Sequence, residues 1–251
     1  MEMERKIMMG FENNYAQTEN RRVTLYFMRH GQTIINKAGR VQGWWDGILT
    51  EEGIAVAENV ALGLRNIKFN GVYSSDLGRG VKTAKMIIKA NKMKNRLEVK
   101  EITELREIYF GKYEGQIESI MFKDIFEYLN VKSFEEAAKI PNFGRAFVNA
   151  CASLDETGAA ENYVKLISRI TNGINKICEE ILEYGGGNVL IVAHGGMLRN
   201  FLKEIDNNVK VENIENSSIS KVEYVNGNYN IVSINDMSYK EKGEKIKEMN
   251  K

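Results

Sequence analysis

The chain has little cysteine, and its apolar residues form no long run. Only two of the 251 residues are cysteine, Cys151 and Cys178, and they form neither a CxxC pair nor a disulfide framework. Cys178 follows Ile174 by one helical step, so we expect it to be a small buried hydrophobic residue. No apolar run approaches the roughly 18 to 20 residues that span a bilayer. We therefore expect a cytoplasmic protein without membrane contact.

A charge excess of either sign is also missing. The formal net charge is +1, which argues against a generic nucleic-acid binder, because such a protein needs a clear basic excess on one face. A small basic pocket inside a neutral surface stays compatible with this balance. Residues 1–20 carry several glutamates and lack the apolar region of a secretory signal, so we assign them to an N-terminal extension.

Strands alternate with long helices along most of the remaining chain. The runs 23–28 and 189–193 are apolar on both faces, which is typical of strands buried under helices, and 72–74 is a shorter strand. Thr50 is the predicted N-cap of a helix with one apolar stripe. We predict a single domain over 21–239, a three-layer α/β/α sandwich with a largely parallel central sheet.

The later part of the chain contains further elements of this sandwich. Helices are predicted over 77–90, 161–183 and 197–204, and the glycine triplet 185–187 ends the second of them. Asn226-Gly227 is a strong hairpin signal between the predicted strands 220–224 and 229–234.

Two segments do not read as strand–helix units. Residues 112–160 contain short helical pieces, one capped by Ser133 and stopped by Pro141, the only proline in the chain. We predict that this segment is an inserted helical cap. The tail 240–251 alternates Lys and Glu, and we predict that it is solvated or frayed.

Histidine is as scarce as cysteine, but its two positions are alike. His30 and His194 each stand directly after a predicted buried strand and directly before a glycine. Ligands of open α/β sheets bind outside the carboxyl ends of parallel strands, so both imidazoles should lie at that edge. A structural histidine and a zinc pair are the alternatives, although no third zinc ligand lies at helical or hairpin spacing.

Four blocks of sequence share one family signature. They are 27–53 (FMRHGQTIINKAGRVQGWWDGILTEEG), 73–84, 105–115 (LREIYFGKYEG) and the strand that ends in the HGG of 194–196. In this order, from residue 23 to about 205, they resemble the blocks of the histidine phosphatase superfamily, also called phosphoglycerate mutase-like. The resemblance implies His30 as the nucleophile that transiently carries a phosphoryl group, and Glu107 as the general acid.

The resemblance also implies the residues that bind the phosphoryl group. Arginine pairs bidentately with phosphate oxygens, and a neutral imidazole has one ring nitrogen free to attack phosphorus. The implied set comprises Arg29, Asn36, Gln42, Gly43, Arg79, His194 and Gly195, of which Arg29, Arg79 and His194 also act in catalysis. Read alone, Arg79 would be a solvated helix arginine and Glu107 a surface carboxylate, with Glu104 as a rival acid. Of Trp44 and Trp45, one would line the mouth of the site.

The implied phosphohistidine serves two reactions, since water or a second hydroxyl of a bound sugar acid can accept the phosphoryl group. Block 105–115 is similar to the phosphatase branch, and the arginine-rich stretch of glycolytic mutases is not seen after Glu107. We therefore expect a phosphomonoester hydrolase of a small phosphorylated metabolite, with no cofactor and no metal. A phosphoglycerate mutase is the alternative, and a catalytically silent binding protein would require loss of a core residue. A homodimer is compatible with the sequence.

Overall fold

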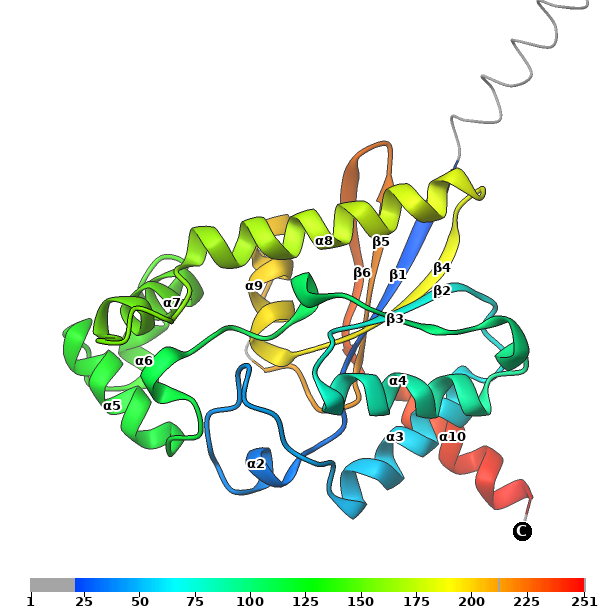
Figure 1. The fold of residues 1–251 in the computed structure, drawn as a ribbon, viewed down its shortest axis with the longest axis horizontal. Helices are drawn as coiled ribbons and strands as arrows, with labels where there is room; N and C mark the ends of the chain where they lie inside the picture. Colours follow the sequence, from blue (N-terminus) through cyan, green and yellow to red (C-terminus); the bar gives the residue numbers. More distant parts are fainter. Residues whose placement is uncertain (1–20, 212, 251) are drawn as a thin grey trace, which may run out of the picture.

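A six-stranded sheet forms the centre of the molecule (Figure 1). The computed structural model describes residues 21–211 and 213–250, so the predicted N-terminal extension lies outside the described residues. The strand order is β3-β2-β4-β1-β5-β6. The parallel strands are β1 (Arg22–Arg29), β2 (Phe69–Ser74), β3 (Val99–Glu101) and β4 (Gly187–Ala193). The antiparallel strands are β5 (Ile219–Val225) and β6 (Asn228–Asp236).

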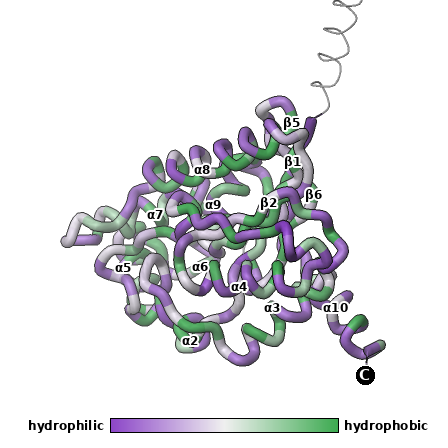
Figure 2. The backbone as a smooth tube through the Cα atoms, turned by 45° about the vertical axis from the view of Figure 1, so that its right-hand side comes forward, coloured by the Kyte–Doolittle hydropathy of each residue, from purple (hydrophilic) through white to green (hydrophobic). Residues whose placement is uncertain are grey.

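Helices cover both faces of this sheet, which confirms the predicted three-layer sandwich. Leu25 and Phe27 of β1 belong to the core under α8 (Tyr163–Glu183) and α9 (Gly195–Ile205). Their neighbours Tyr26 and Met28 belong to the core under α3 (Glu51–Leu64) and α4 (Gly78–Ala90). Side chains of a strand alternate between its faces, so the run Leu25–Met28 of β1 is apolar because both faces are covered. In Figure 2 the turns of α8 alternate between hydrophilic and hydrophobic, as expected of such a covering helix.

The predicted N-cap Thr50 and the predicted turn Asn226-Gly227 are found as expected, and Asn162 is an N-cap that the sequence had not indicated. Thr50 accepts a hydrogen bond from the Gly53 N–H at the start of α3, and Asn162 accepts one from the Lys165 N–H at the start of α8. Asn226 and Gly227 both have positive φ, 50° and 80°, as a two-residue hairpin turn between β5 and β6 requires. Cys151 and Cys178 are both buried and free.

The segment predicted as a cap forms helices at one end of the sandwich (Figure 1). They pack through phenylalanine rings, as between Phe122 and Phe147, whose centroids are 5.6 Å apart. The cap helices are α5 (Glu118–Tyr128), α6 (Phe134–Ala137) and α7 (Phe143–Leu154). Short elements elsewhere are α2 (Ile34–Lys37), η1 (Lys94–Arg96), η2 (Thr103–Leu105) and η3 (Gly111–Tyr113).

The prediction of a solvated or frayed tail is wrong. Residues Ser238–Met249 form helix α10, which packs along α3 (Figure 1). Two glycines allow this close approach: a Cβ at Gly243 would clash with the carbonyl oxygen of Asn59, and one at Gly63 with that of Tyr239. The alternating Lys and Glu side chains give no hydrophobic pattern that would predict this helix. Its contact with α3 depends on Gly243, which has no side chain. Within 21–211 and 213–250, no helix is both long and apolar enough to cross a membrane.

Candidate active site

His30 and His194 lie side by side at the carboxyl ends of two paired strands. β1 and β4 run parallel with Arg29 opposite Ala193, so each histidine is the first residue beyond its strand. The ring centroids are 5.1 Å apart, and both side chains are buried. This is the edge at which the sequence predicts a ligand site.

The imidazole of His30 is neutral, with a lone pair on Nε2. Nδ1 lies 2.8 Å from the carbonyl oxygen of Gly31, which can only accept, so Nδ1 carries the proton. Nε2 in turn accepts a hydrogen bond of 3.2 Å from Nε of Arg79. Burial, and then the positive charges of Arg79 and Arg29, hold the pKa of His30 well below 6.5. This is the protonation state that a nucleophile needs.

His194 is neutral as well, in the opposite tautomer. Its Nδ1 accepts a hydrogen bond of 3.0 Å from Arg79, so Nε2 carries the proton and donates to the Ser75 hydroxyl at 2.7 Å. Burial holds the pKa of His194 well below 6.5, and Arg79 lowers it further. The two imidazoles are therefore oriented by one arginine and held neutral by their surroundings.

Arg79, at the start of α4, is 2% exposed, so it is not the solvated helix arginine that its position alone would predict. Every N–H of its guanidinium has an acceptor. Besides the two imidazoles, these are the carbonyl oxygens of Gly43 (2.7 Å) and Trp45 (3.1 Å) and the carboxylate of Asp46 (2.9 Å). Asp46 also balances the buried charge, which otherwise would be costly.

The side chain of Arg29 lies against Gly195, the first residue of α9. It donates to the carbonyl oxygen of Ile214 at 2.6 Å, whereas its Nε is buried without an acceptor among the described residues. A Cβ on Gly195 would lie 3.1 Å from this Nε, so glycine lets the guanidinium lie against the helix start. The first N–H groups of a helix have no partner inside the helix and attract anions. Arg29 and Gly195 together therefore offer N–H donors that suit an anion at this helix end.

Glu107 lies at the same helix end with its carboxylate fully hydrogen-bonded. It accepts the backbone N–H groups of Ile108 (2.9 Å), Gly196 (2.8 Å) and Met197 (2.6 Å), and it is 7% exposed. It is thus not a surface carboxylate. The rival acid Glu104 lies outside the site, where its carboxylate pairs with Lys176 at 3.0 Å.

The backbone around Glu107 is held by Arg169. This guanidinium donates to the carbonyl oxygens of Glu104, Arg106 and Glu107 and forms an ion pair with Glu161 at 2.5 Å. Glu161 also accepts the Tyr109 N–H at 3.0 Å. Arg169 is therefore a positioning residue for Glu107.

A cavity of about 230 Å³ opens beside these groups. Gln42 accepts from the Thr33 hydroxyl at 2.6 Å, and its Nε2 is buried without an acceptor among the described residues. Asn36 accepts from the Thr33 N–H at 3.2 Å. Five predicted site residues line the cavity, namely Arg29, Asn36, Gln42, Glu107 and Gly195. His30 and His194 are the chain neighbours of its lining residues Arg29 and Gly195, whereas Arg79 lines a separate surface hollow.

Gly43 does not line this cavity. Its N–H donates to Glu114 at 3.1 Å and its carbonyl accepts from Arg79, so both polar groups are used within the protein. Gly43 therefore positions Arg79 and leaves no N–H for a phosphate oxygen.

The loop after Gly43 is organised by Glu114, which also accepts the N–H groups of Trp44 and Trp45. Trp44 stacks on Tyr109 at 4.7 Å between ring centroids, an ordinary packing contact. Trp45 is half exposed and lines a surface hollow together with Arg79, and neither tryptophan is among the residues that line the cavity.

Several residues of the site were not expected from the sequence. Asp46 and Glu114 lie within the family blocks but carry no distinguishing pattern there, and Ser75 is a small polar residue after a strand. Arg199 of α9 lines the cavity and was not expected at all. Its spacing of three and four residues from Gly196 and Gly195, which places it on their helix face, is the signal that could have found it.

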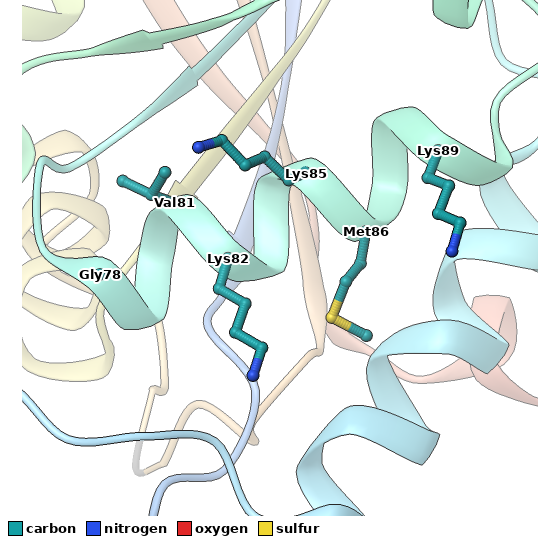
Figure 3. Close-up of a pocket in the computed structure, with 6 residues that line it drawn as sticks. All are labelled: Gly78, Val81, Lys82, Lys85, Met86 and Lys89. Carbon is teal, nitrogen blue, oxygen red and sulfur yellow. The ribbon is translucent and has the colours of Figure 1, made fainter.

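A second hollow of about 500 Å³ runs along the outside of α4 (Figure 3). Lys82, Met86 and Lys89 point to one side of the helix there, and the lining contains no histidine, arginine or carboxylate. It is separate from the paired imidazoles.

A metal does not suit the donors of the candidate site. In the part of the chain that the structure describes, no group of three or more His, Cys, Asp or Glu side chains is placed to hold a metal ion. Moreover, His30 and His194 each present an accepting nitrogen to the cation Arg79, which would repel a metal.

Comparison with known proteins gives a consistent picture. A family model described as histidine phosphatase superfamily (branch 1) matches residues 25–237. The chain is 32% identical to phosphoglycerate mutase-like protein 4 of Arabidopsis thaliana over 196 residues, covering 77% of this chain and 76% of the relative. It is 29% identical to metal-independent phosphoserine phosphatase of the same plant over 228 residues, covering 89% and 86%. The crystal structure of phosphoglycerate mutase from Bacillus anthracis str. Sterne superposes with a TM-score of 0.86 at 37% identity, covering 91% and 99%.

Proposed function

The chain belongs to the histidine phosphatase superfamily, whose phosphatases and mutases are enzymes, and we propose that it is a metal-independent phosphomonoester hydrolase. The observation that carries this proposal is the neutral His30, whose Nε2 lone pair is aimed at Arg79. An arginine at the attacking nitrogen keeps the imidazole unprotonated and offers N–H donors to the group that it attacks.

In the first step, Nε2 of His30 forms a bond to phosphorus while the bond to the ester oxygen breaks. Arg79 exchanges its contacts with the two imidazoles for phosphoryl oxygens, and Arg29 and the Gly195 N–H bind the others. His194 takes up a proton from solvent when the negative charge of the bound phosphoryl group offsets the positive charges around it, and then donates from Nδ1. Loss of one such donor typically costs about 2.7 to 4 kcal/mol of transition-state stabilisation.

Glu107 donates the proton that the leaving oxygen needs. The proton enters with a substrate bound as the phosphate monoanion and passes through Glu107, which lies at the start of α9, to the leaving group. In the second step the carboxylate takes a proton from water, the water oxygen bonds to phosphorus, and the bond to His30 breaks. The proton on Glu107 leaves with phosphate, which is released as the monoanion, His194 returns its proton to solvent, and His30 is neutral again.

The cavity supports a small phosphorylated metabolite as the substrate. A volume of about 230 Å³ admits a short leaving group beside the phosphoryl position, and the cap helices close its far side with Met121, Phe122 and Phe147. Phosphoserine and phosphoglycerate, which the names of the relatives mention, are of this size.

A mutase activity is the second candidate, favoured by the 37% identity to the Bacillus anthracis phosphoglycerate mutase. It would use the same phosphohistidine but return the phosphoryl group to a second hydroxyl of the bound acid. The two activities differ in product, because only the phosphatase releases inorganic phosphate in proportion to substrate.

The test is a panel of phosphate monoesters, including p-nitrophenyl phosphate and 3-phosphoglycerate, assayed for released phosphate with and without EDTA. We expect hydrolysis that EDTA leaves unchanged and that His30→Ala abolishes. Activity that disappears with chelator and returns with zinc or magnesium would overturn the proposal. Isomerisation of 3-phosphoglycerate, with a trace of 2,3-bisphosphoglycerate and without phosphate release, would favour the mutase.

A further inference from the structure

Arg199 is a half-buried arginine to which the proposed chemistry gives no role. It lies on α9, lines the cavity beside Glu107, and has no ion pair or hydrogen bond with residues 21–211 or 213–250. Its Nε is fully buried without an acceptor. Burial lowers the pKa of Arg199, while the nearby Glu107 carboxylate raises it. A guanidinium that faces a cavity with a fully buried and unpaired Nε lacks part of its hydration, which is costly, so this arrangement points to an anion that binds it.

The position of Arg199 on α9 fixes where that anion would be. Gly195, Gly196 and Arg199 share one helix face, since they are spaced by three and four residues. At 1.5 Å per residue, Arg199 lies about 6 Å further along the helix axis than Gly195. The order along α9 is thus the phosphoryl position at Gly195, the carboxylate of Glu107 at Gly196, and then Arg199.

This end of the cavity has more hydrogen-bond donors than acceptors. A ligand that binds here should therefore present a hydrogen-bond acceptor. The carboxylate of Glu107 is already occupied by three backbone N–H groups and is not paired with Arg199. Gln42 offers a second buried donor without an acceptor. The other acidic residue lining the cavity, Glu118 of the cap, is more exposed, and burial of its inner side raises its pKa.

We propose that Arg199 determines substrate specificity by binding a carboxylate on the leaving group. The substrate is then a phosphorylated carboxylic acid whose carboxylate lies about one helical turn from phosphorus. The planar guanidinium can pair with both carboxylate oxygens at once, which a neutral hydroxyl cannot reproduce. This inference rests on the proposed phosphatase function and narrows its substrate class.

The kinetic test compares 3-phosphoglycerate with glycerol 3-phosphate, which differ only in a carboxylate and a hydroxymethyl group. The wild-type enzyme should prefer 3-phosphoglycerate. In Arg199→Gln, the ratio of the two kcat/KM values should fall about 10- to 100-fold, mainly through KM for 3-phosphoglycerate, as expected for one charged hydrogen-bonded pair. Arg199→Lys should restore part of the ratio. Lys203→Gln is the matched control, because Lys203 lies one turn further along α9, bonds to the Asn207 carbonyl and does not line the cavity.

A binding test separates this inference from the proposed function. Calorimetry with the non-hydrolysable probes 3-phosphonopropionate and propylphosphonate needs no turnover. We expect the wild-type protein to bind 3-phosphonopropionate at least 10-fold more tightly, and Arg199→Gln to lose that difference. Equal binding of both probes by the wild-type protein, or an unchanged kinetic ratio in Arg199→Gln, would overturn the inference. If neither ester is hydrolysed but the probes still differ, the phosphatase proposal fails and the carboxylate site stands.

Discussion

Arg79 donates from Nε to Nε2 of His30 at 3.2 Å, and the same guanidinium donates to Nδ1 of His194 at 3.0 Å. One cation therefore sets the tautomers of both imidazoles and keeps them unprotonated. Since its remaining N–H groups are bound by Asp46 and two carbonyl oxygens, the guanidinium cannot rotate away. Nε2 of His30, the nitrogen that we propose attacks phosphorus, and the arginine that orients it form one rigid unit.

Replacing Arg79 tests this unit. Arg79→Lys keeps the positive charge but loses the fork that reaches both imidazoles, so kcat on p-nitrophenyl phosphate should fall by about 10²- to 10³-fold. Arg96→Lys is the control, because Arg96 belongs to η1 and lines none of the cavities near the histidines. A loss below tenfold in Arg79→Lys would show that charge alone is sufficient.

The lowered pKa values of His30 and His194 predict how stability depends on pH. The unfolded chain takes up these two protons near pH 6.5, whereas the folded protein does so only well below it. The contribution of the two histidines to the unfolding free energy is therefore complete above pH 6.5, and it is lost as the pH falls towards their folded-state pKa values. Each histidine adds a slope of at most about 1.4 kcal/mol per pH unit.

Urea denaturation between pH 5 and pH 7.5 measures this slope. His30→Asn and His194→Asn should each flatten the fall in unfolding free energy below pH 6.5, relative to the wild-type protein. The comparison removes the contribution of the carboxylates, which all three proteins share. Parallel curves for wild type and both variants would contradict the prediction.

Helix α10 predicts a stability effect far from the histidines. Gly243→Ala places a Cβ against the carbonyl oxygen of Asn59 on α3, and the two helices must separate to admit it. We expect a loss of about 1 to 3 kcal/mol in unfolding free energy. Lys242→Ala on the exposed side of the same helix is the control and should stay within about 0.5 kcal/mol. Equal values for both variants would show that α10 contributes no packing.

The sequence predicted those parts of the fold in which periodicity and burial agree. β1, α3 and α8 were predicted because their apolar residues follow the strand or helix repeat, and α3 also because Thr50 is an N-cap of the expected kind. α10 was missed because its contact with α3 depends on Gly243, and a glycine carries no hydropathy signal in an otherwise charged segment.

The candidate site was predicted where a local motif places a residue at a strand end, as for His30 and His194. Gly43 was expected at the phosphate but instead positions Arg79, because a motif match does not show which way a backbone N–H points. Arg199 was missed because an arginine on an amphipathic helix normally faces solvent. Only the cap and the start of α9, brought together by folding, enclose it.

The proposed roles of His30 and Glu107 predict different losses for different leaving groups. Glu107→Gln keeps the shape of the side chain but cannot transfer the proton. A p-nitrophenolate departs unaided, whereas an alkoxide needs the proton, and general-acid assistance is typically worth about 10²- to 10⁴-fold. The amide also faces at least one N–H donor that the carboxylate accepted, which should lower activity on every substrate alike.

The loss of activity on an alkyl ester divided by the loss on p-nitrophenyl phosphate therefore measures proton transfer alone, because the unpaired N–H donor lowers both activities alike. We expect Glu107→Gln to lose at least tenfold more activity on glycerol 3-phosphate than on p-nitrophenyl phosphate, in steady-state assays of released phosphate. Glu104→Gln is the matched control and should remain near wild type on both, since Glu104 pairs with Lys176 outside the cavity. Equal losses on both substrates would make Glu107 a positioning residue for α9. The proton would then have to reach the leaving oxygen from the cap, where Glu118 is the carboxyl group that lines the cavity.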